Sequence, residues 1–179
     1  MSKTINKKTH LKLILALFVP VVLVGLVLDR LSKDLTILYL KDKDPIDLIP
    51  GVIRLTYCEN RGAAFSLLEG QRWFFIVLTV IVLAFVAVAL WRCWIKTAFG
   101  YFSTALCVSG AIGNFIDRLT QGFVVDMFEP TFIKFAIFNV ADIYLTIGAI
   151  LLGIYLLFVH DKIVAKEKEA SATEASPEA

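Results

Sequence analysis

The chain of 179 residues contains little histidine and little cysteine. Its only histidines, His10 and His160, lie near the two ends of the sequence, far from any cluster of metal-binding side chains. The three cysteines, Cys58, Cys93 and Cys107, have no metal-like spacing, and we interpret them as packing residues without a disulfide framework. We therefore expect no metal and no other cofactor, and carboxylate and amide side chains remain as the candidates for chemistry.

Charged residues are also scarce. They make up 19% of the chain, whereas hydrophobic residues make up 58% and the mean hydropathy is +0.76. A soluble domain is usually about half apolar and a quarter charged, so this composition indicates a polytopic membrane protein. The net charge of +2 gives no reason to expect a nucleic acid as partner.

Four long apolar runs predict an all-α membrane fold with four transmembrane helices, at about residues 12–31, 72–92, 97–117 and 136–159. The first run follows several lysines, as a signal peptide would. It ends at Asp29 and Lys33 rather than at a small-residue cleavage site, so we interpret it as a retained span. We expect one membrane domain over residues 1–162 and a disordered cytoplasmic tail over residues 163–179.

Two polar connections join the spans on one side of the membrane. In the first, residues 34–71, the segment Val52–Tyr57 alternates like a strand after a Pro50-Gly51 turn, and Ala63–Leu68 could be its partner strand or a short interfacial segment. The sequence thus predicts a small extracytoplasmic β-rich segment between the first two helices. Residues 119–134 form the second connection.

Basic residues without acids precede the first span and fill the middle turn, and further lysines follow the last span; they are Lys3, Lys7, Lys8, Lys12, Arg92, Lys96, Lys162, Lys166 and Lys168. Lysine and arginine favour the cytoplasmic side, so both termini are expected to be cytoplasmic.

Polar residues gather on the opposite side, whichever way the four spans are inserted. They are Asp29, Lys33, Asn60, Gly62, Asn114, Asp117, Arg118, Asp126, Asn139 and Asp142. Several are three or four residues apart on a helix and share one face. With a helix beginning near residue 136, Asp142 would lie roughly 10 Å inside it. Unpaired polar groups at this depth cost several kcal/mol, so the cluster predicts a functional pocket.

Two aspartates that share a proton can activate a water and protonate a departing amine, which is the chemistry of aspartic peptidases. Asp142 is the firmest candidate because it is the most deeply placed acid on that side. Asp117 and Asp126 compete for the second position, and spacing alone does not decide between them.

Several motifs, in this order, resemble those of the bacterial lipoprotein signal peptidases, the type II signal peptidases. After the Asp29 to Lys33 pair they are Asn60-Arg61-Gly62-Ala63-Ala64-Phe65-Ser66, Gly113-Asn114-Phe115-Ile116-Asp117-Arg118, Gly122-Phe123-Val124-Val125-Asp126 and Phe138-Asn139-Val140-Ala141-Asp142. The resemblance extends from the first span to the last.

This resemblance implies an aspartic endopeptidase of the bacterial cytoplasmic (inner) membrane, with its active site toward the outer leaflet. It would cut prolipoproteins just before a diacylglyceryl-modified cysteine, with Asp126 and Asp142 as the catalytic pair. The supporting residues, which would shape the pocket and hold the substrate, would be Asp29, Lys33, Asn60, Gly62, Asn114, Arg118 and Asn139. The resemblance also implies sensitivity to the cyclic peptide antibiotic globomycin. We expect a monomer surrounded by membrane lipids.

Three features differ from the pattern of that family. Met127 stands where phenylalanine is frequent, Ser109 stands where a second glycine is common, and the segment from Phe128 to Phe138 is short and lacks a proline before Phe138. These differences concern the outer loop and the substrate preference.

The same residues also allow other interpretations. A proton-coupled transporter or channel would need ionisable groups near the midplane, where this sequence has none, and a scaffold subunit would leave the polar pocket unexplained. Asp29 and Lys33 could be an ordinary helix-end ion pair, Asn114 and Arg118 could serve bundle packing, and Gly62 could serve a tight turn.

Overall fold

The computed structural model describes residues 7–62, 68–160, 162, 163 and 165. Within them, four helices are long and apolar enough to cross a membrane: Lys7–Leu40, Arg72–Trp91, Ala98–Thr120 and Val140–His160. This confirms the prediction of a mainly helical membrane protein. Residues 63–67, which include most of the proposed partner strand, lie outside the described part, as does most of the tail expected over residues 163–179.

The first helix is continuous but changes its winding near Pro20. It consists of α1 (Lys7–Leu13), the π-helical turn η1 (Ile14–Phe18) and α2 (Val19–Leu40). The N–H of Val19, the residue before the proline, bonds to the carbonyl of Ile14, five residues earlier. Because proline has no N–H and crowds the preceding turn, local widening of the helix accommodates it.

The same helix continues beyond the predicted span to Leu40, so residues 34–40 are helical rather than part of a polar connection. Tertiary contacts explain the difference. Thr36 and Leu40 are buried on this extension, and the Thr36 hydroxyl lies 3.4 Å from the sulfur of Met127. The extension therefore provides a wall against which part of the small sheet packs.

The remaining helices are α3 (Arg72–Trp91), α4 (Ala98–Thr120) and α5 (Val140–Ile154), the last continued by the π-helical segment η3 (Tyr155–His160). Helix α4 occupies the centre of the bundle and packs against α2, α3 and α5. Its small residues permit this: a side chain at Gly110 would meet the carbonyl oxygen of Ala141 at 2.3 Å. Close approach of backbones at small residues is typical of membrane helix packing.

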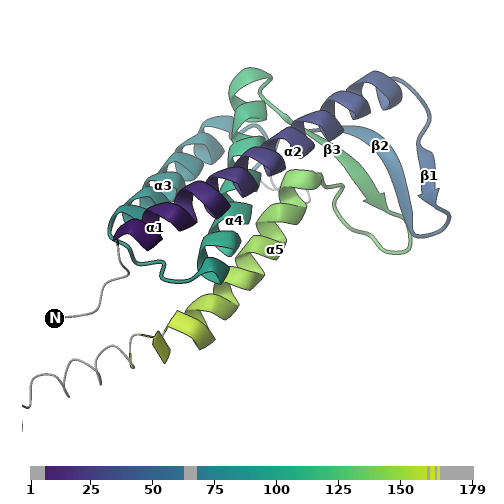
Figure 1. The fold of residues 1–179 in the computed structure, drawn as a ribbon. Coiled ribbons are helices and arrows are strands. Elements are labelled where there is room, and N and C mark those ends of the chain that lie inside the picture. Colours follow the sequence, from purple (N-terminus) through teal and green to yellow (C-terminus); the bar gives the residue numbers. More distant parts are fainter. Residues whose placement is uncertain (1–6, 63–67, 161, 164, 166–179) are drawn as a thin grey trace, which may run out of the picture.

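Three antiparallel strands form a sheet in the order β1 (Ile46–Ile49), β2 (Ile53–Asn60) and β3 (Val124–Pro130). Figure 1 shows the sheet projecting sideways from the bundle, at the end where α2 and α4 finish and α5 begins. The predicted connection at residues 119–134 contains β3, a strand that was not predicted from the sequence. Its first residues, Val124 and Val125, are fully buried, and Cys58 of β2 pairs with Asp126.

Helix α5 begins at Val140, later than residue 136, because the preceding residues are extended. Phe138 pairs with Phe128 of β3, and Asn139 caps the helix in an extended conformation. Asp142 therefore lies in the first helical turn, and the expected depth of 10 Å was wrong.

The two described histidines lie at the opposite end of the bundle. His10 forms a hydrogen bond with Tyr101, and the ring of His160 packs edge-on against Tyr155. Both tyrosines are buried, with Ile95, in an apolar cluster. No histidine of the described chain therefore lies near the polar end, which confines catalytic candidates there to other side chains.

Candidate active site

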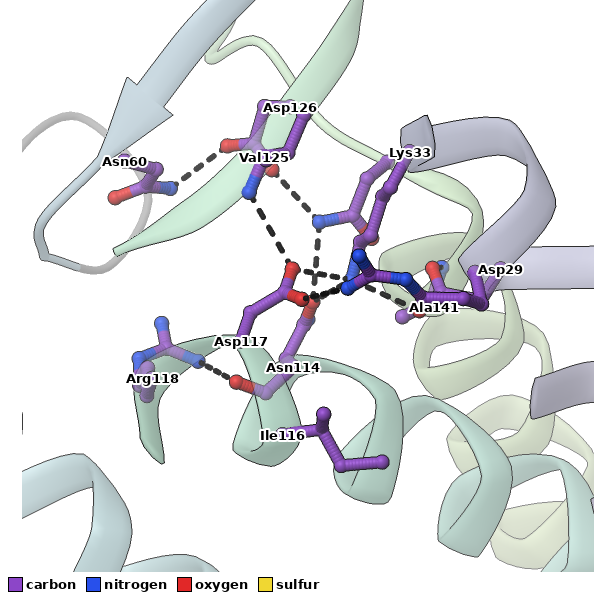
Figure 2. A network of polar contacts seen from close by, with 12 residues as sticks. Asp29, Lys33, Asn60, Asn114, Ile116, Asp117, Arg118, Val125, Asp126 and Ala141 are labelled. Atoms are coloured by element: carbon purple, nitrogen blue, oxygen red, sulfur yellow. Dashed lines mark hydrogen bonds and ion pairs between the residues drawn. The ribbon is translucent and has the colours of Figure 1, made fainter. Parts of the chain in front are cut away.

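Asp126 is held on the buried face of β3 by two asparagines. Its side chain is 1% exposed. One carboxylate oxygen accepts a hydrogen bond from the Asn60 amide at 2.8 Å, and the other accepts one from the Asn139 amide at 2.7 Å. A carboxylate in an amide-lined pocket of this kind is fixed in position (Figure 2).

Asp142 is fixed by the start of α5. With Asn139 it forms a capping box, in which the Asn139 side chain accepts from the Asp142 N–H at 2.9 Å and the Asp142 carboxylate accepts from the Asn139 N–H at 3.1 Å. Its other oxygen accepts from the Asn114 amide at 2.8 Å. Asn139 therefore links the two aspartates directly, through its side chain to one and its backbone to the other.

The orientation of each amide group is set by a second partner. The side-chain oxygen of Asn60 accepts from the Gly62 N–H at 2.9 Å. The oxygen of Asn114 accepts from Lys33 at 3.1 Å and from Asn139 at 3.1 Å. Because these oxygens are already occupied by donors, the NH₂ groups turn toward the carboxylates. All four oxygens of the aspartate pair consequently receive an N–H group.

The pKa of Asp126 is raised from 3.8 to about 7, mainly by burial and also by the nearby charge of Asp142. Hydrogen bonds from Asn60 and Asn139 and the charge of Lys33 oppose part of this rise. At neutral pH the pair can therefore hold one proton between two carboxyl groups. This is the state in which one group accepts a proton from water while the other supplies one.

Behind the aspartate pair lies a buried ion cluster. The Lys33 amino group is 2.8 Å from the Asp29 carboxylate and 2.9 Å from the Asp117 carboxylate, and the Lys33 side chain is 1% exposed. The second oxygen of Asp29 accepts from the Ala141 N–H at 3.0 Å. Asp29 and Lys33 thus lie inside the helix bundle and not at a helix end.

Arg118 connects helix α4 to the loop after β2. Its guanidinium group donates to the Gly62 carbonyl at 3.0 Å and lies 4.7 Å from the centre of the Phe75 ring. The group lines the main cavity together with Asn60, so it places a cation and a hydrogen-bond donor beside the aspartate pair.

A cavity of about 680 Å³ opens at Asp142 between α3, α4, α5 and residues 135–138. Its polar end is formed by Asn60, Asn114, Arg118 and Asp142. The other walls are mainly apolar, and they comprise Phe75, Leu78, Thr79, Val82, Ala111, Phe135, Ala136, Ile137, Phe138, Ile143, Leu145, Thr146 and Ile147. This shape suits a ligand with a long apolar part and one polar, reactive group.

The structure brings Asp126, Asp142 and the seven residues expected to support them to one end of the bundle. Figure 2 shows Asp29, Lys33, Asn60, Asn114, Arg118 and Asp126 of this set. Sequence reasoning overlooked the contacts of Asp117 with Lys33 and with the strand that carries Asp126. It also overlooked the capping role of Asn139. That role was readable from the sequence, because Asn at one position and Asp three residues later is a helix-start signature.

The sequence profile described as "Signal peptidase (SPase) II" matches residues 21–158. The lipoprotein signal peptidase of Lactococcus lactis subsp. lactis (strain IL1403) is 47% identical over 139 residues, which cover 76% of this chain and 91% of the relative. The lipoprotein signal peptidase of Streptococcus thermophilus (strain CNRZ 1066) is 46% identical over 139 residues, covering 77% of this chain and 91% of the relative.

A solved structure described as a bacterial membrane enzyme structure obtained by the in meso method at 1.9 Å resolution superposes with a TM-score of 0.72. It is 31% identical and covers 89% of this chain and 99% of its own. A second such structure, at 2.3 Å resolution, gives a TM-score of 0.71 at 31% identity, covering 88% of this chain and 92% of its own. The sequence profile, the curated relatives and the shared fold agree, and the chain belongs to the signal peptidase II family.

Proposed function

We propose that this protein is an aspartic endopeptidase that removes the signal peptide from diacylglyceryl-modified prolipoproteins and cuts just before the lipidated cysteine. The observation that carries the proposal is the linkage of Asp126 and Asp142 through Asn139, with every carboxylate oxygen receiving an N–H donor. The lipoprotein signal peptidases to which the chain is similar support the choice of substrate.

In the proposed reaction, the ionised carboxyl group of the pair takes a proton from a water molecule as the water oxygen attacks the scissile carbonyl carbon. The protonated carboxyl group donates its proton to the carbonyl oxygen, so a neutral tetrahedral diol forms. The C–N bond then breaks as the amine nitrogen receives a proton, and the diol returns a proton to the pair. The pair thus ends the cycle with the single proton it held at the start.

The main cavity suits this substrate. Its apolar walls between α3 and α5 would receive an apolar signal peptide or acyl chain, and its polar end would hold the scissile bond next to Asp142. Arg118 lies at the same end and can donate to a substrate carbonyl, as it does now to the carbonyl of Gly62.

We place the active site at the outer face of the bacterial cytoplasmic membrane, with both termini in the cytoplasm. The four spans and the basic residues near the termini and in the middle turn support this orientation. The enzyme would work as a monomer, because all the proposed catalytic and supporting residues come from one chain.

The direct test is cleavage of a purified precursor by the purified protein in detergent or lipid. We expect the diacylglyceryl-modified precursor to be cut before its cysteine, the unmodified precursor to remain intact, and globomycin to block the reaction. Asp126→Asn and Asp142→Asn should each lower the rate by at least about 1,000-fold while the protein still inserts and folds. Cleavage by either variant near the wild-type rate would exclude a mechanism based on two aspartates.

A further inference from the structure

Asp117 has no part in the reaction proposed above, yet it is among the most buried charged side chains of the described chain, at 1% exposure. It lies on α4, one residue before Arg118, and does not line the cavity proposed for the substrate. A buried carboxylate that contacts neither solvent nor substrate requires a physical reason, because its desolvation is costly.

One oxygen of Asp117 makes two contacts that lead toward the aspartate pair. It lies 2.9 Å from the Lys33 amino group and accepts a long hydrogen bond, 3.4 Å, from the N–H of Val125, the residue before Asp126. Lys33 in turn donates to the oxygen of Asn114, whose amide donates to Asp142. Asp117 therefore contacts the residue next to Asp126 and is linked to Asp142 through three contacts, by way of Lys33 and Asn114. Figure 2 shows Asp117 beside Lys33, Asn114 and Val125.

We propose that Asp117 is a positioning residue for the catalytic pair: it holds Lys33 so that Asn114 faces Asp142, and it holds strand β3 so that Asp126 faces the same point. The inference rests on the proposed peptidase function. It assigns to Asp117 a role through other residues, without contact to the substrate.

The charge of Asp117 has a second effect, on the proton held by the pair. The charged and titratable groups that face this region are Asp29, Arg30 and Lys33 from α2, Cys58 from β2, Asp117 and Arg118 from α4, Asp126 from β3, and Asp142 and Tyr144 from α5. Lys33 stabilises the ionised form of Asp126. Asp117 offsets part of the Lys33 charge, so removing its charge should make the pair lose its proton at lower pH.

The variant Asp117→Asn removes the negative charge of Asp117 and keeps its contacts with Lys33 and Val125. The asparagine oxygen can accept from both Lys33 and Val125, as a single carboxylate oxygen does now. Its NH₂ group would face Arg30, which lies 3.6 Å from the other oxygen and has a side chain 51% exposed, so Arg30 can turn away. We expect the alkaline limb of the pH–kcat/KM profile to move down by about one pH unit.

Asp117→Ala removes both the charge and the two contacts. We expect kcat on the diacylglyceryl-modified precursor to fall about 10- to 100-fold, since small displacements of catalytic groups have effects of that size. KM should stay within about threefold, because Asp117 does not line the substrate cavity. The control is Asp34→Asn, which removes a half-exposed carboxylate whose ion pair is with Arg30; its profile should match the wild type.

The outcomes separate the two proposals. If the wild-type protein does not cleave the modified precursor, the peptidase assignment fails and this inference fails with it. If the wild type cleaves but Asp117→Asn has an unchanged pH profile, and Asp117→Ala has an unchanged kcat per folded molecule, only the positioning role is wrong. The pH profile does not depend on how much protein folds, so a poorly folding variant still gives a decisive result.

Discussion

At the residue scale, the site is organised by the direction of amide groups more than by the number of charges. Asn60, Asn114 and Asn139 each use the side-chain oxygen to accept from a fixed donor and the NH₂ group to reach a carboxylate. An aspartate at any of these positions would bring an acceptor against an acceptor. The asparagines therefore hold the two carboxyl groups in place without adding negative charge. The two aspartates can then share a single proton between them.

The elevated pKa of Asp126 predicts a pH-dependent change in stability. With a pKa of about 7 in the folded chain and 3.8 as the unperturbed value, the folded state binds the proton more tightly than the unfolded state. Its stabilising contribution is complete below pH 4 and is lost as the pH rises to about 7. The difference is on the order of 4 kcal/mol.

Asp126→Asn removes this ionisation, so we expect its midpoint of thermal unfolding, relative to the wild type, to be higher at pH 8 than at pH 5. The amide also places an NH₂ group against Asn60 or Asn139, but that cost is the same at both pH values. Thermal unfolding in one detergent at both pH values measures the effect. An equal difference between variant and wild type at pH 5 and pH 8 would contradict the raised pKa.

Much of the polar set was readable from sequence, because a charged or amide residue beside an apolar run has few reasons to be there. What sequence could not resolve was which acid pairs with Asp142. Spacing alone does not decide between Asp117 and Asp126, and only the fold shows that Asp117 faces Lys33 whereas Asp126 faces Asn139. That choice depends on β3, whose partner β2 lies more than sixty positions away.

At the element scale, the site exists because α4 allows its neighbours to approach closely. A side chain at Gly113 would meet a carboxylate oxygen of Asp29 at 2.5 Å, and one at Gly148 would meet the backbone of Cys107 at 2.7 Å. These small residues bring α2 and α5 against α4, so that residues from three helices reach a common point. The small-residue pattern was visible in the sequence, but its facing partners were not.

Gly110→Ala tests this packing. The added methyl group would meet the backbone oxygen of Ala141 at 2.3 Å, in the turn that carries Asp142. We expect a loss of about 1–3 kcal/mol in stability and a fall in kcat. Gly153→Ala is the matched control, because nothing lies within 4 Å of the added atom and alanine favours the helix by up to about 1 kcal/mol. Thermal unfolding and cleavage assays of both variants measure the two effects. Equal stability and equal kcat in the two variants would contradict the packing role of Gly110.

The sheet shows where local patterns were insufficient. Strand β2 was expected from its alternation, but β3 is a short apolar run that ends in Glu129 and Pro130 and lacks clear alternation. It becomes a strand because β2 supplies its hydrogen-bonding partner and the C-terminal turns of helix α2 cover its buried face. Pairing between strands distant in sequence is a tertiary effect, and local propensity does not encode it.

At the scale of the whole molecule, the bundle is open on one side. Helix α3 packs mainly on α4, whereas α2 and α5 pack on α4 and on each other. The cavity of about 680 Å³ occupies the space that this arrangement leaves between α3 and α5. Under the proposed function, a substrate with acyl chains would enter from the side, within the bilayer, and reach Asp142 without leaving the membrane.

Ala111→Trp tests the use of this opening. Ala111 lies on α4 and lines the cavity, and an indole ring there would occupy space that a lipid or signal peptide needs under the proposed function. We expect kcat/KM for the diacylglyceryl-modified precursor to fall at least about tenfold, mainly through KM, because the aspartate pair is untouched. Ala84→Trp on α3 is the control, since Ala84 is exposed on that helix and does not line the cavity. If both variants cleave at the wild-type rate while folding normally, the substrate does not pass through this cavity, and the side entrance must be abandoned even if the two aspartates remain catalytic.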